Sequence, residues 1–380
     1  MNVLHFINNL NREGAQIMVS NLVSANDKSR INYSVCARQP GGPLAADLRE
    51  QGIEVLAPPK YYGFRSIRQS IFFLKRLCID NRISIIHAHM ADAACLGWLV
   101  ARKLKLPLVI SHHGHDILLK CNPVCRCVYF VLLSLAARYA AMNVAVSPSV
   151  AERVRKLLPV KAQSIQIISN GVHIPDDSQL NKKIIRKDRD YSSLTLVSVG
   201  RLVPLKGQYQ LIYAVARLVS YFPGIHLYIV GDGDRAQALK QQAENQQVSR
   251  YIEFTGPVED VTEYLAKADI YVSSSRSEGM PISILEAMAW RLPVVASDIP
   301  GNSSVVNQGE TGFLYELDNI DDLVQKIIEV ATNAGLANGL ASRARLMVAQ
   351  HYSAKVSEKK HAQLYQRILG QSAAGLHNGK

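Results

Sequence analysis

The strongest chemical signal in the sequence is a pair of acidic residues, Glu278 and Glu286, that stand eight positions apart. They enclose a turn-forming stretch that leads into an expected helix, Gly279-Met280-Pro281-Ile282-Ser283. The first backbone N–H groups of a helix have no partner inside it and attract anions. Carboxylates beside them can accept hydrogen bonds from ligand hydroxyls. The stretch therefore indicates either a site for an anionic, hydroxyl-bearing ligand or a surface helix with two incidental acids.

Two basic residues lie in a loop that follows another expected strand. The strand ends at Gly200, Arg201 and Lys206 follow it, and a helix is expected just after Gly207. A guanidinium offers a planar fork of donors and an ammonium a compact charge, and together they suit a diphosphate. A diphosphate leaving group needs such compensation because negative charge develops on it as its bond breaks. The alternative is a pair of solvated loop cations.

A glycine-containing loop follows the first expected strand. It ends at Glu13-Gly14-Ala15, where a helix begins, and Gly14 permits close approach of the backbone to a phosphate or sugar. The loop lacks the G-x-G-x-x-G pattern, which argues against a dinucleotide cofactor at this position.

Histidines gather where a buried strand, residues 108–110, is expected to end. The sequence there reads Ser111-His112-His113-Gly114-His115-Asp116. Polar residues at the carboxyl end of a strand favour a site over a core, and three histidines in four positions favour a ligand contact by one of them. His87 and His89, expected after a strand at 83–86, are interpreted as packing or loop residues.

We expect no metal. The pairs Asp232/Asp234 and Asp188/Asp190 have D-x-D spacing but lie in polar turns, where this spacing is common by chance. Three cysteines are spaced C-x3-C-x-C, which is not a standard zinc pattern, at Cys121, Cys125 and Cys127.

Elements that could position these residues alternate as strand and helix along the whole chain. The expected fold class is α/β: two doubly wound, Rossmann-like lobes facing a central cleft. The boundaries are residues 1–172 for the first lobe, 173–193 for a polar linker, 194–353 for the second lobe and 354–380 for a last helix. The strand candidates are residues 3–7, 33–36, 53–56, 83–87, 108–110, 143–146, 194–199, 225–230, 252–254, 270–272 and 294–296.

Composition indicates a folded protein with an uneven charge. The 380 residues are 48% hydrophobic and carry a net charge of +12. Residues 1–172 hold 21 lysines and arginines against 9 aspartates and glutamates, whereas the remainder holds 22 of each sign. No signal peptide is expected, and the longest apolar run, residues 128–137, is about half the roughly 20 residues of a spanning helix. We expect a cytoplasmic protein with reduced thiols whose first lobe meets an anionic partner.

The segment 65–78 is the candidate for that contact. On a helical wheel one arc carries a basic stripe with an aromatic residue, namely Arg65, Arg68, Phe72, Lys75 and Arg76. The opposite arc, expected to pack on the lobe, carries Ile67, Leu74, Leu77 and Cys78. The pattern is typical of an interfacial helix on anionic lipid, and equally of a solvated charged face.

The motifs taken in order resemble one family over nearly the whole chain, the retaining GT-B glycosyltransferases of bacterial lipopolysaccharide, capsule and exopolysaccharide synthesis, with their E-x7-E motif. The matching positions are Gly14-Ala15, His113-Gly114, Asn170-Gly171, Gly200-Arg201, Lys206-Gly207, Gly231-Asp232-Gly233, Glu278-Gly279, Glu286, Pro293-Val294 and Thr311-Gly312. The chain departs from the usual pattern at Glu13 and Arg291, where many members have glycine, and near Ser304, where many have glutamate.

The resemblance implies roles for these residues. Arg201 and Lys206 would bind the donor diphosphate, and Glu278 with the backbone of residues 279–283 would hold the donor sugar and phosphate. Glu286 would bond the ribose, Gly14 would let loop amides approach the donor, and His113 would lie near the sugar. Catalytic roles would fall to Glu278, His113 and Lys206. The last helix would cross back to the first lobe, and no divalent metal would be needed.

The function expected from residues and resemblance together is sugar transfer from a nucleoside diphosphate sugar to a lipid-linked or glycan acceptor, by a protein peripheral on the inner face of the cytoplasmic membrane. Two alternatives stay open: a nucleotide-sugar epimerase on the same fold, and a non-catalytic assembly protein attached to the membrane. A nucleic-acid partner is not expected, because no binding module or aromatic platform is recognisable.

Overall fold

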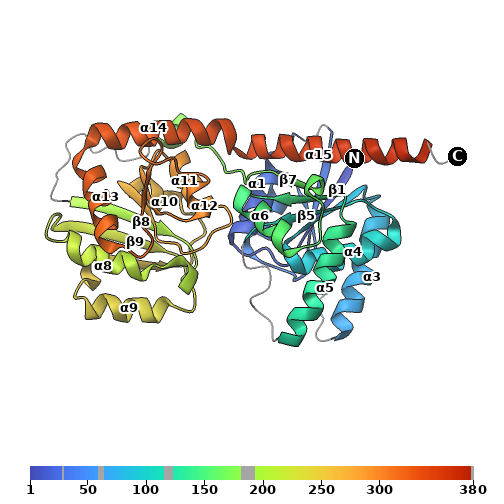
Figure 1. The fold of residues 1–380 in the computed structure, drawn as a ribbon, viewed down its shortest axis with the longest axis horizontal. Helices are drawn as coiled ribbons and strands as arrows, with labels where there is room; N and C mark the ends of the chain where they lie inside the picture. Colours follow the sequence, from blue (N-terminus) through green and yellow to red (C-terminus); the bar gives the residue numbers. More distant parts are fainter. Residues whose placement is uncertain (28–29, 59–63, 115–122, 181–192, 378–380) are drawn as a thin grey trace. The chain divides into compact units, whose positions relative to one another are not determined.

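The computed structural model of the chain describes residues 1–27, 30–58, 64–114, 123–180 and 193–377. It divides into two compact units (Figure 1). Unit 1 consists of Met1–Gly171 together with Ala354–Lys380, and unit 2 is Val172–Ser353. Part of the expected linker, residues 181–192, lies outside the described residues.

Unit 1 is built on a seven-stranded parallel sheet in the order β3-β2-β1-β4-β5-β6-β7. Its strands are β1 (Asn2–Ile7), β2 (Asn32–Ala37), β3 (Glu54–Leu56), β4 (Ile85–His89), β5 (Leu108–His112), β6 (Met142–Ala145) and β7 (Ile165–Ile167). Its helices are α1 (Gly14–Ser24), α2 (Pro43–Glu50), α3 (Phe64–Asp80), α4 (Met90–Leu104), α5 (Pro123–Tyr139), α6 (Pro148–Leu157) and α15 (Ala354–His377).

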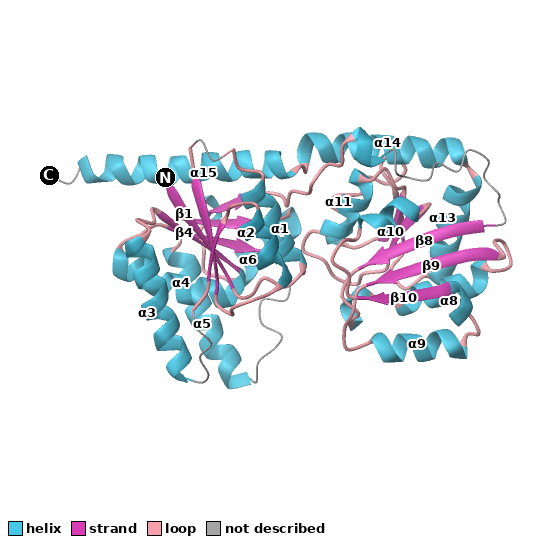
Figure 2. Cartoon of the chain, turned by 180° about the vertical axis from the view of Figure 1, so that it is seen from behind, coloured by secondary structure: helices cyan, strands magenta, loops and turns pink. Residues whose placement is uncertain are grey.

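Unit 2 repeats the design with a six-stranded parallel sheet, β10-β9-β8-β11-β12-β13 (Figure 2). Its strands are β8 (Ser193–Val199), β9 (Gly224–Val230), β10 (Ile252–Gly256), β11 (Ile270–Ser273), β12 (Val294–Ser297) and β13 (Phe313–Tyr315). Its helices are α7 (Asp177–Leu180), α8 (Tyr209–Leu218), α9 (Ala236–Asn245), α10 (Thr262–Lys267), α11 (Ile282–Ala289), α12 (Pro300–Ser303), α13 (Ile320–Thr332) and α14 (Ala334–His351).

Both sheets have the doubly wound order in which the direction of winding reverses at the first strand. The reversal falls between β1 and β4 in unit 1 and between β8 and β11 in unit 2. Loops that leave neighbouring strands at a reversal point diverge and make room for a ligand at the carboxyl ends. The expectation of two doubly wound, Rossmann-like α/β units is confirmed.

Helix α15 contributes to the interior of unit 1 although it follows unit 2 in the sequence. The Tyr365 hydroxyl lies 2.6 Å from His87 Nδ1, and both side chains are fully buried. The Tyr33 hydroxyl donates to Glu358 Oε1 at 3.1 Å. The first unit is therefore assembled from two distant pieces of the chain.

The structure settles the interpretation of two histidines. His87, already inside the expected strand 83–87, and His89, expected after it, both belong to β4 and are wholly buried, so they are packing residues and not loop residues. The strand extends three residues past the aliphatic run because pairing with β1 and β5 satisfies its backbone, while side-chain partners satisfy His87. Buried polar groups are tolerated when they are hydrogen-bonded.

The helical-wheel expectation for α3 holds at most positions and fails at one. Leu74, Leu77 and Cys78 are buried and Phe72 is 68% exposed, but Ile67, expected to pack inward, is 41% exposed. Ile67 lies two turns before Leu74, where the inward face of the helix is first fully buried. The Arg65 side chain lies outside the described residues.

No helix in the described ranges combines the length and apolar composition that a bilayer crossing requires.

Candidate active site

The centre of the candidate site is an ion pair between two loops of unit 2. Lys206 Nζ lies 2.5 Å from Glu278 Oε1, and the two side chains are 22% and 13% exposed. Lys206 follows β8 and Glu278 follows β11, the two strands that meet where the winding of the sheet reverses. Because these two strands are neighbours in the sheet, two residues that lie 72 positions apart in the sequence come into contact.

Glycine at position 207 lets the Lys206 loop approach the β11 loop. Gly207 has φ +63°, and a Cβ atom there would stand 2.2 Å from the Ser274 carbonyl oxygen. The Ser274 hydroxyl donates to the Lys206 carbonyl oxygen at 3.0 Å. Any side chain at this position would collide with the Ser274 carbonyl oxygen, so the close contact requires glycine unless the loop moves.

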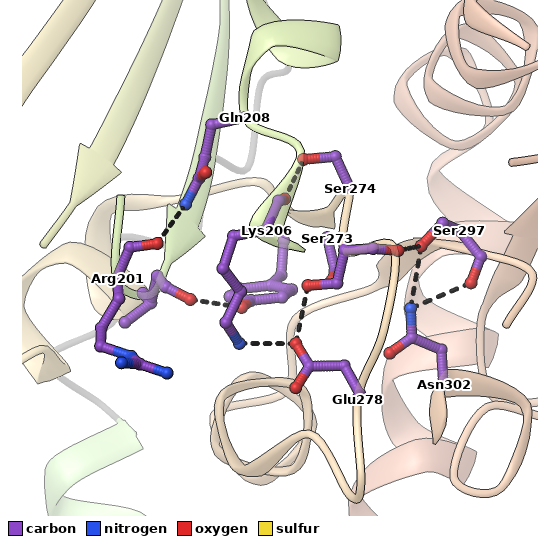
Figure 3. A network of polar contacts seen from close by, with 11 residues as sticks. Arg201, Lys206, Gln208, Ser273, Ser274, Glu278, Ser297 and Asn302 are labelled. Carbon is purple, nitrogen blue, oxygen red and sulfur yellow. Dashed lines mark hydrogen bonds and ion pairs between the residues drawn. The ribbon is translucent and has the colours of Figure 1, made fainter. Parts of the chain in front are cut away.

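Glu278 is held by its own loop and by the chain beyond β12 (Figure 3). The Ser275 hydroxyl donates to the same carboxylate oxygen that meets Lys206, at 2.7 Å. Gly301 packs against the Glu278 backbone, where a Cβ atom would stand 2.4 Å from the carbonyl oxygen. Neither Ser275 nor Gly301 was singled out in the sequence, although Ser275 stands only three positions before Glu278.

Further hydrogen bonds join this loop to β12. The Ser297 hydroxyl donates to the Ser275 carbonyl oxygen at 2.5 Å, and the Asn302 amide donates to the Ser297 carbonyl oxygen at 2.9 Å (Figure 3). All of these polar atoms belong to buried residues. The carboxylate is therefore fixed by a network that spans three neighbouring strand ends.

Arg201 occupies the same loop as Lys206 but has different surroundings. Its carbonyl oxygen accepts from the Gln208 amide at 2.9 Å, while its side chain is exposed (Figure 3). Within the described part of the chain the guanidinium forms no ion pair, in contrast to the neighbouring ammonium. It is thus available to an anion without first giving up an internal partner.

The first turn of α11 lies beside Glu278 with no side-chain cap. Its N-cap residue is Pro281, which makes no side-chain capping hydrogen bond and has no backbone N–H to donate. Of the expected phosphate-binding stretch, Pro281 is therefore not a backbone donor, whereas Ile282 and Ser283 are first-turn amides without intrahelical acceptors. Gly279 and Met280 precede the helix, and Met280 is buried. Arg291, after the helix, keeps a left-handed backbone at φ +55°.

Glu286 lies one turn inside α11 and is half-buried. Burial raises its pKa to about 7, and the charge of Asp260 contributes in the same direction. The Tyr271 hydroxyl donates to the Val199 carbonyl oxygen at 3.3 Å. The charges of Glu278 and Glu286 both add to the burial that raises the pKa of Tyr271.

Gly14 and His113 belong to unit 1. Gly14 is exposed and begins α1, after the loop that leaves β1, and His113 follows β5 directly. β1 and β5 flank β4 in a parallel sheet, so both loops emerge at the same edge of it. Burial lowers the pKa of His113 to about 3, so its ring is neutral. His115 and Asp116 lie outside the described residues.

Comparison with known proteins accounts for this arrangement. Residues 12–174 match the model of Glycosyltransferase Family 4, and residues 181–347 match that of Glycosyl transferases group 1. Together the two matches take in most of both units. The chain belongs to the GT-B glycosyltransferases. This glycosyltransferase is accordingly an enzyme.

Named relatives act in the synthesis of bacterial glycans. The glycosyltransferase is 27% identical to the UDP-Gal:alpha-D-GlcNAc-diphosphoundecaprenol alpha-1,3-galactosyltransferase of Escherichia coli, over 80% of this chain and 81% of the relative. It is 29% identical to LpsE, a lipopolysaccharide core biosynthesis glycosyltransferase of Rhizobium meliloti, over 57% of this chain and 62% of the relative.

A solved structure shares the fold. HepE of Anabaena, in complex with UDP-glucose, superposes with a TM-score of 0.82 at 21% identity, covering 97% of this chain and all of the other. At this identity the similarity shows only that the two proteins share a fold.

Proposed function

We propose that this glycosyltransferase moves a hexose unit from a nucleoside diphosphate sugar to a lipid-linked or glycan acceptor in cell-surface polysaccharide synthesis. The observation that carries the proposal is the Lys206–Glu278 pair at the reversal point of the unit 2 sheet. An ammonium has three donors, so Lys206 can keep Glu278 while it binds a phosphate oxygen.

Charge compensation of the leaving group would then come from the protein itself. Arg201 would add a second cation, and the first-turn amides of α11 at Ile282 and Ser283 would add donors to the same diphosphate. These groups act where negative charge grows as the sugar–phosphate bond breaks, which lowers the barrier to that step. On this basis no divalent metal is required, and turnover should be unchanged by a chelator such as EDTA.

The two glutamates would serve different parts of the donor. Glu278, held by Ser275 and Lys206, presents its second oxygen as an acceptor for sugar hydroxyls. Glu286 would accept from the ribose. His113 in unit 1 would contact the transferred sugar, and Gly14 would admit backbone amides to the donor. The acceptor hydroxyl would attack on the face that the diphosphate leaves, so that the anomeric configuration is retained.

The relatives narrow the donor and acceptor classes to be tested. HepE forms complexes with UDP and UDP-glucose, and the Escherichia coli relative is named for transfer from UDP-Gal to a diphosphoundecaprenol-linked sugar. We therefore propose a nucleotide sugar as donor, with UDP-hexoses as the first to examine. A polyprenyl diphosphate sugar is the first acceptor.

An anionic membrane surface is proposed as the place where unit 1 meets a lipid-linked acceptor, at the cytoplasmic face. Helix α3 exposes Phe72 beside Arg68, Lys75 and Arg76. Helix α5 packs, like α3, against α4 (Figure 1). It exposes an apolar row at Val128, Val131 and Leu135. Exposed apolar side chains flanked by cations are typical of surfaces that rest on anionic lipid.

The test is release of nucleotide from a panel of sugar nucleotides, first without and then with a polyprenyl diphosphate sugar. We expect one donor to be used, with turnover raised by the acceptor, and the Lys206→Ala and Glu278→Ala variants to fold but to lose turnover. The anomeric proton coupling of the product reports retention. Conversion of the donor to another sugar nucleotide without an acceptor would instead identify an epimerase, and no turnover of any donor would refute the proposal.

A further inference from the structure

A second polar network joins the two loops that carry Lys206 and Glu278. The Tyr209 hydroxyl, at the start of α8, donates to Asp318 Oδ1 at 2.7 Å and accepts from the Arg276 guanidinium at 2.9 Å. The same guanidinium also donates directly to Asp318. The three side chains therefore close a hydrogen-bonded triangle, which we call the Tyr209 clamp.

The members of the clamp stand close to the proposed donor-binding residues in the sequence. Tyr209 comes three positions after Lys206, and Arg276 comes two positions before Glu278. Asp318 belongs to a third segment, between β13 and α13. The clamp thus ties each of the two donor-binding loops to one shared carboxylate.

Arg276 holds the Lys206 loop at two points. Its backbone N–H donates to the Leu205 carbonyl oxygen at 2.8 Å, and its guanidinium donates to the Tyr209 hydroxyl. Leu205 directly precedes Lys206 in the sequence, and Tyr209 follows it after a short interval. The lysine is therefore enclosed between two attachments to the same residue of the Glu278 loop.

Asp318 is itself held in place. Its backbone is left-handed, with φ +67°, a conformation that aspartate and asparagine tolerate better than most residues do. The next residue, Asn319, caps α13 by accepting from the Asp322 N–H at 3.0 Å. The carboxylate accordingly projects from a turn that is fixed to the start of a helix.

The clamp is charged and lies at the surface of unit 2. The hydrogen bonds from Tyr209 and Arg276 lower the pKa of Asp318, so its carboxylate is ionised at neutral pH. The Arg276 and Asp318 side chains are 39% and 44% exposed, and an ion pair this exposed contributes little to the free energy of unfolding. Its effect is expected on the local geometry of the two loops rather than on the stability of unit 2.

We propose that Tyr209, Arg276 and Asp318 are positioning residues that hold the Lys206 loop against the Glu278 loop before the donor diphosphate binds. The inference rests on the proposed function for the ligand of Lys206. The clamp does not touch the donor but acts through Lys206. An ammonium that is already in place loses less conformational freedom when it binds a phosphate than one on a loosely held loop.

Direct binding of the donor by Arg276 is the rival explanation, since a guanidinium suits a phosphate. Asp318→Asn distinguishes the two, because it removes a negative charge but keeps an acceptor oxygen and a tolerated backbone. If Arg276 bound the diphosphate, loss of its counter-charge would tighten donor binding. If the clamp positions Lys206, the weaker neutral hydrogen bonds at position 318 would weaken donor binding, by about threefold.

The direct test measures binding of UDP, GDP and dTDP to the full chain by isothermal titration calorimetry, and continues with the tightest of them. Tyr209→Phe removes the hydroxyl of the clamp and changes no charge. We expect it to raise the Kd for the nucleotide about fivefold, the worth of one hydrogen bond, and to lower kcat/KM for the donor by a similar factor. An unchanged Kd, or tighter binding by Asp318→Asn, would overturn the proposal.

A thermodynamic cycle separates positioning from a general structural effect. Lys206→Met removes the group through which the clamp acts. Adding Tyr209→Phe to that variant should therefore weaken nucleotide binding no further, because coupled residues give non-additive effects. The same fivefold loss in both backgrounds would mean that the hydroxyl acts independently of Lys206, against the proposal.

The matched control is Arg217, which forms another exposed ion pair between α8 and α13, with Asp321, away from the Glu278 loop. Arg217→Met should leave nucleotide binding unchanged, whereas Arg276→Met should weaken it about tenfold. Arg276→Lys keeps the charge and N–H donors and should restore most of it. Equal losses in the two methionine variants would reduce the clamp to general charge attraction and overturn the proposal. If the parent binds none of the three nucleotides, the proposed function fails, and the role of the clamp fails with it.

Discussion

Lys206 and Glu278 form a half-buried ion pair across the two strands at which the unit 2 sheet reverses its winding. Removal of one partner leaves the other charge poorly solvated. We expect Lys206→Met and Glu278→Gln each to lower the free energy of unfolding by about 1–3 kcal/mol, and the double variant to lose less than the sum. Urea unfolding of the four proteins measures the coupling. Strictly additive losses would mean that the pair contributes no mutual stabilisation.

Gly207 is expected to tolerate no side chain, because a Cβ atom would overlap the Ser274 carbonyl oxygen. Gly207→Ala should lower the free energy of unfolding by more than about 3 kcal/mol and displace Lys206, which would also reduce turnover. The control is Gly309→Ala, at φ +73° with open space around the Cβ position, where only the backbone cost of about 1–2 kcal/mol applies. Equal effects in thermal unfolding would contradict the steric argument.

Glu286 should make the stability of the enzyme fall as the pH rises. The folded state holds the proton up to about pH 7, whereas the unfolded chain releases it near the ordinary glutamate pKa of 4.5. The folded state therefore binds more protons between these values, and the free energy of unfolding declines across that window by roughly 3 kcal/mol. Glu286→Gln removes the titration, so its stability relative to the parent should rise from pH 4.5 to 7 and then stay level. If the urea stabilities of the parent and the variant change in parallel with pH, folding does not raise the pKa of Glu286.

Tyr365 should stabilise unit 1 through His87. Tyr365→Phe leaves a buried imidazole nitrogen without its partner, which costs about 1–3 kcal/mol. Tyr221→Phe, at a side chain that is 60% exposed, is the control and should change little. Thermal unfolding of both variants checks this, and a Tyr365→Phe protein as stable as the parent would exclude the hydrogen bond as a contributor.

Membrane binding should depend on α3 rather than on total charge. Arg68→Glu with Lys75→Glu should sharply reduce co-sedimentation with vesicles containing anionic phosphatidylglycerol, and added salt should weaken binding by the parent protein. The control, Arg153→Glu with Arg155→Glu, makes the same charge change at exposed positions of α6. If both double variants lose binding equally, the contact is diffuse and α3 has no special part in it.

Most strands of the two sheets could be predicted from the sequence, because the longer buried strands are aliphatic runs. The three-residue strands β7 and β13 were missed although β3, of the same length, was expected at residues 53–56, because so short a run carries too little pattern to be recognised consistently. The strand expected at residues 83–87 stopped two residues short of the end of β4, because His89 resembles a loop residue until His5 and His113 provide its partners. The approach of Lys206 to Glu278 depends on strand order, which no local pattern encodes.

The division of unit 1 between the two ends of the chain has a consequence for biosynthesis. A ribosome makes all of unit 2 before it reaches α15, and until then His87 and the neighbouring face of the first sheet lack the helix that covers them. The later-made unit can therefore finish its fold first, the reverse of the usual N-terminal order. A chain emerging from the ribosome would pass through a stage in which unit 2 is folded while unit 1 still lacks α15.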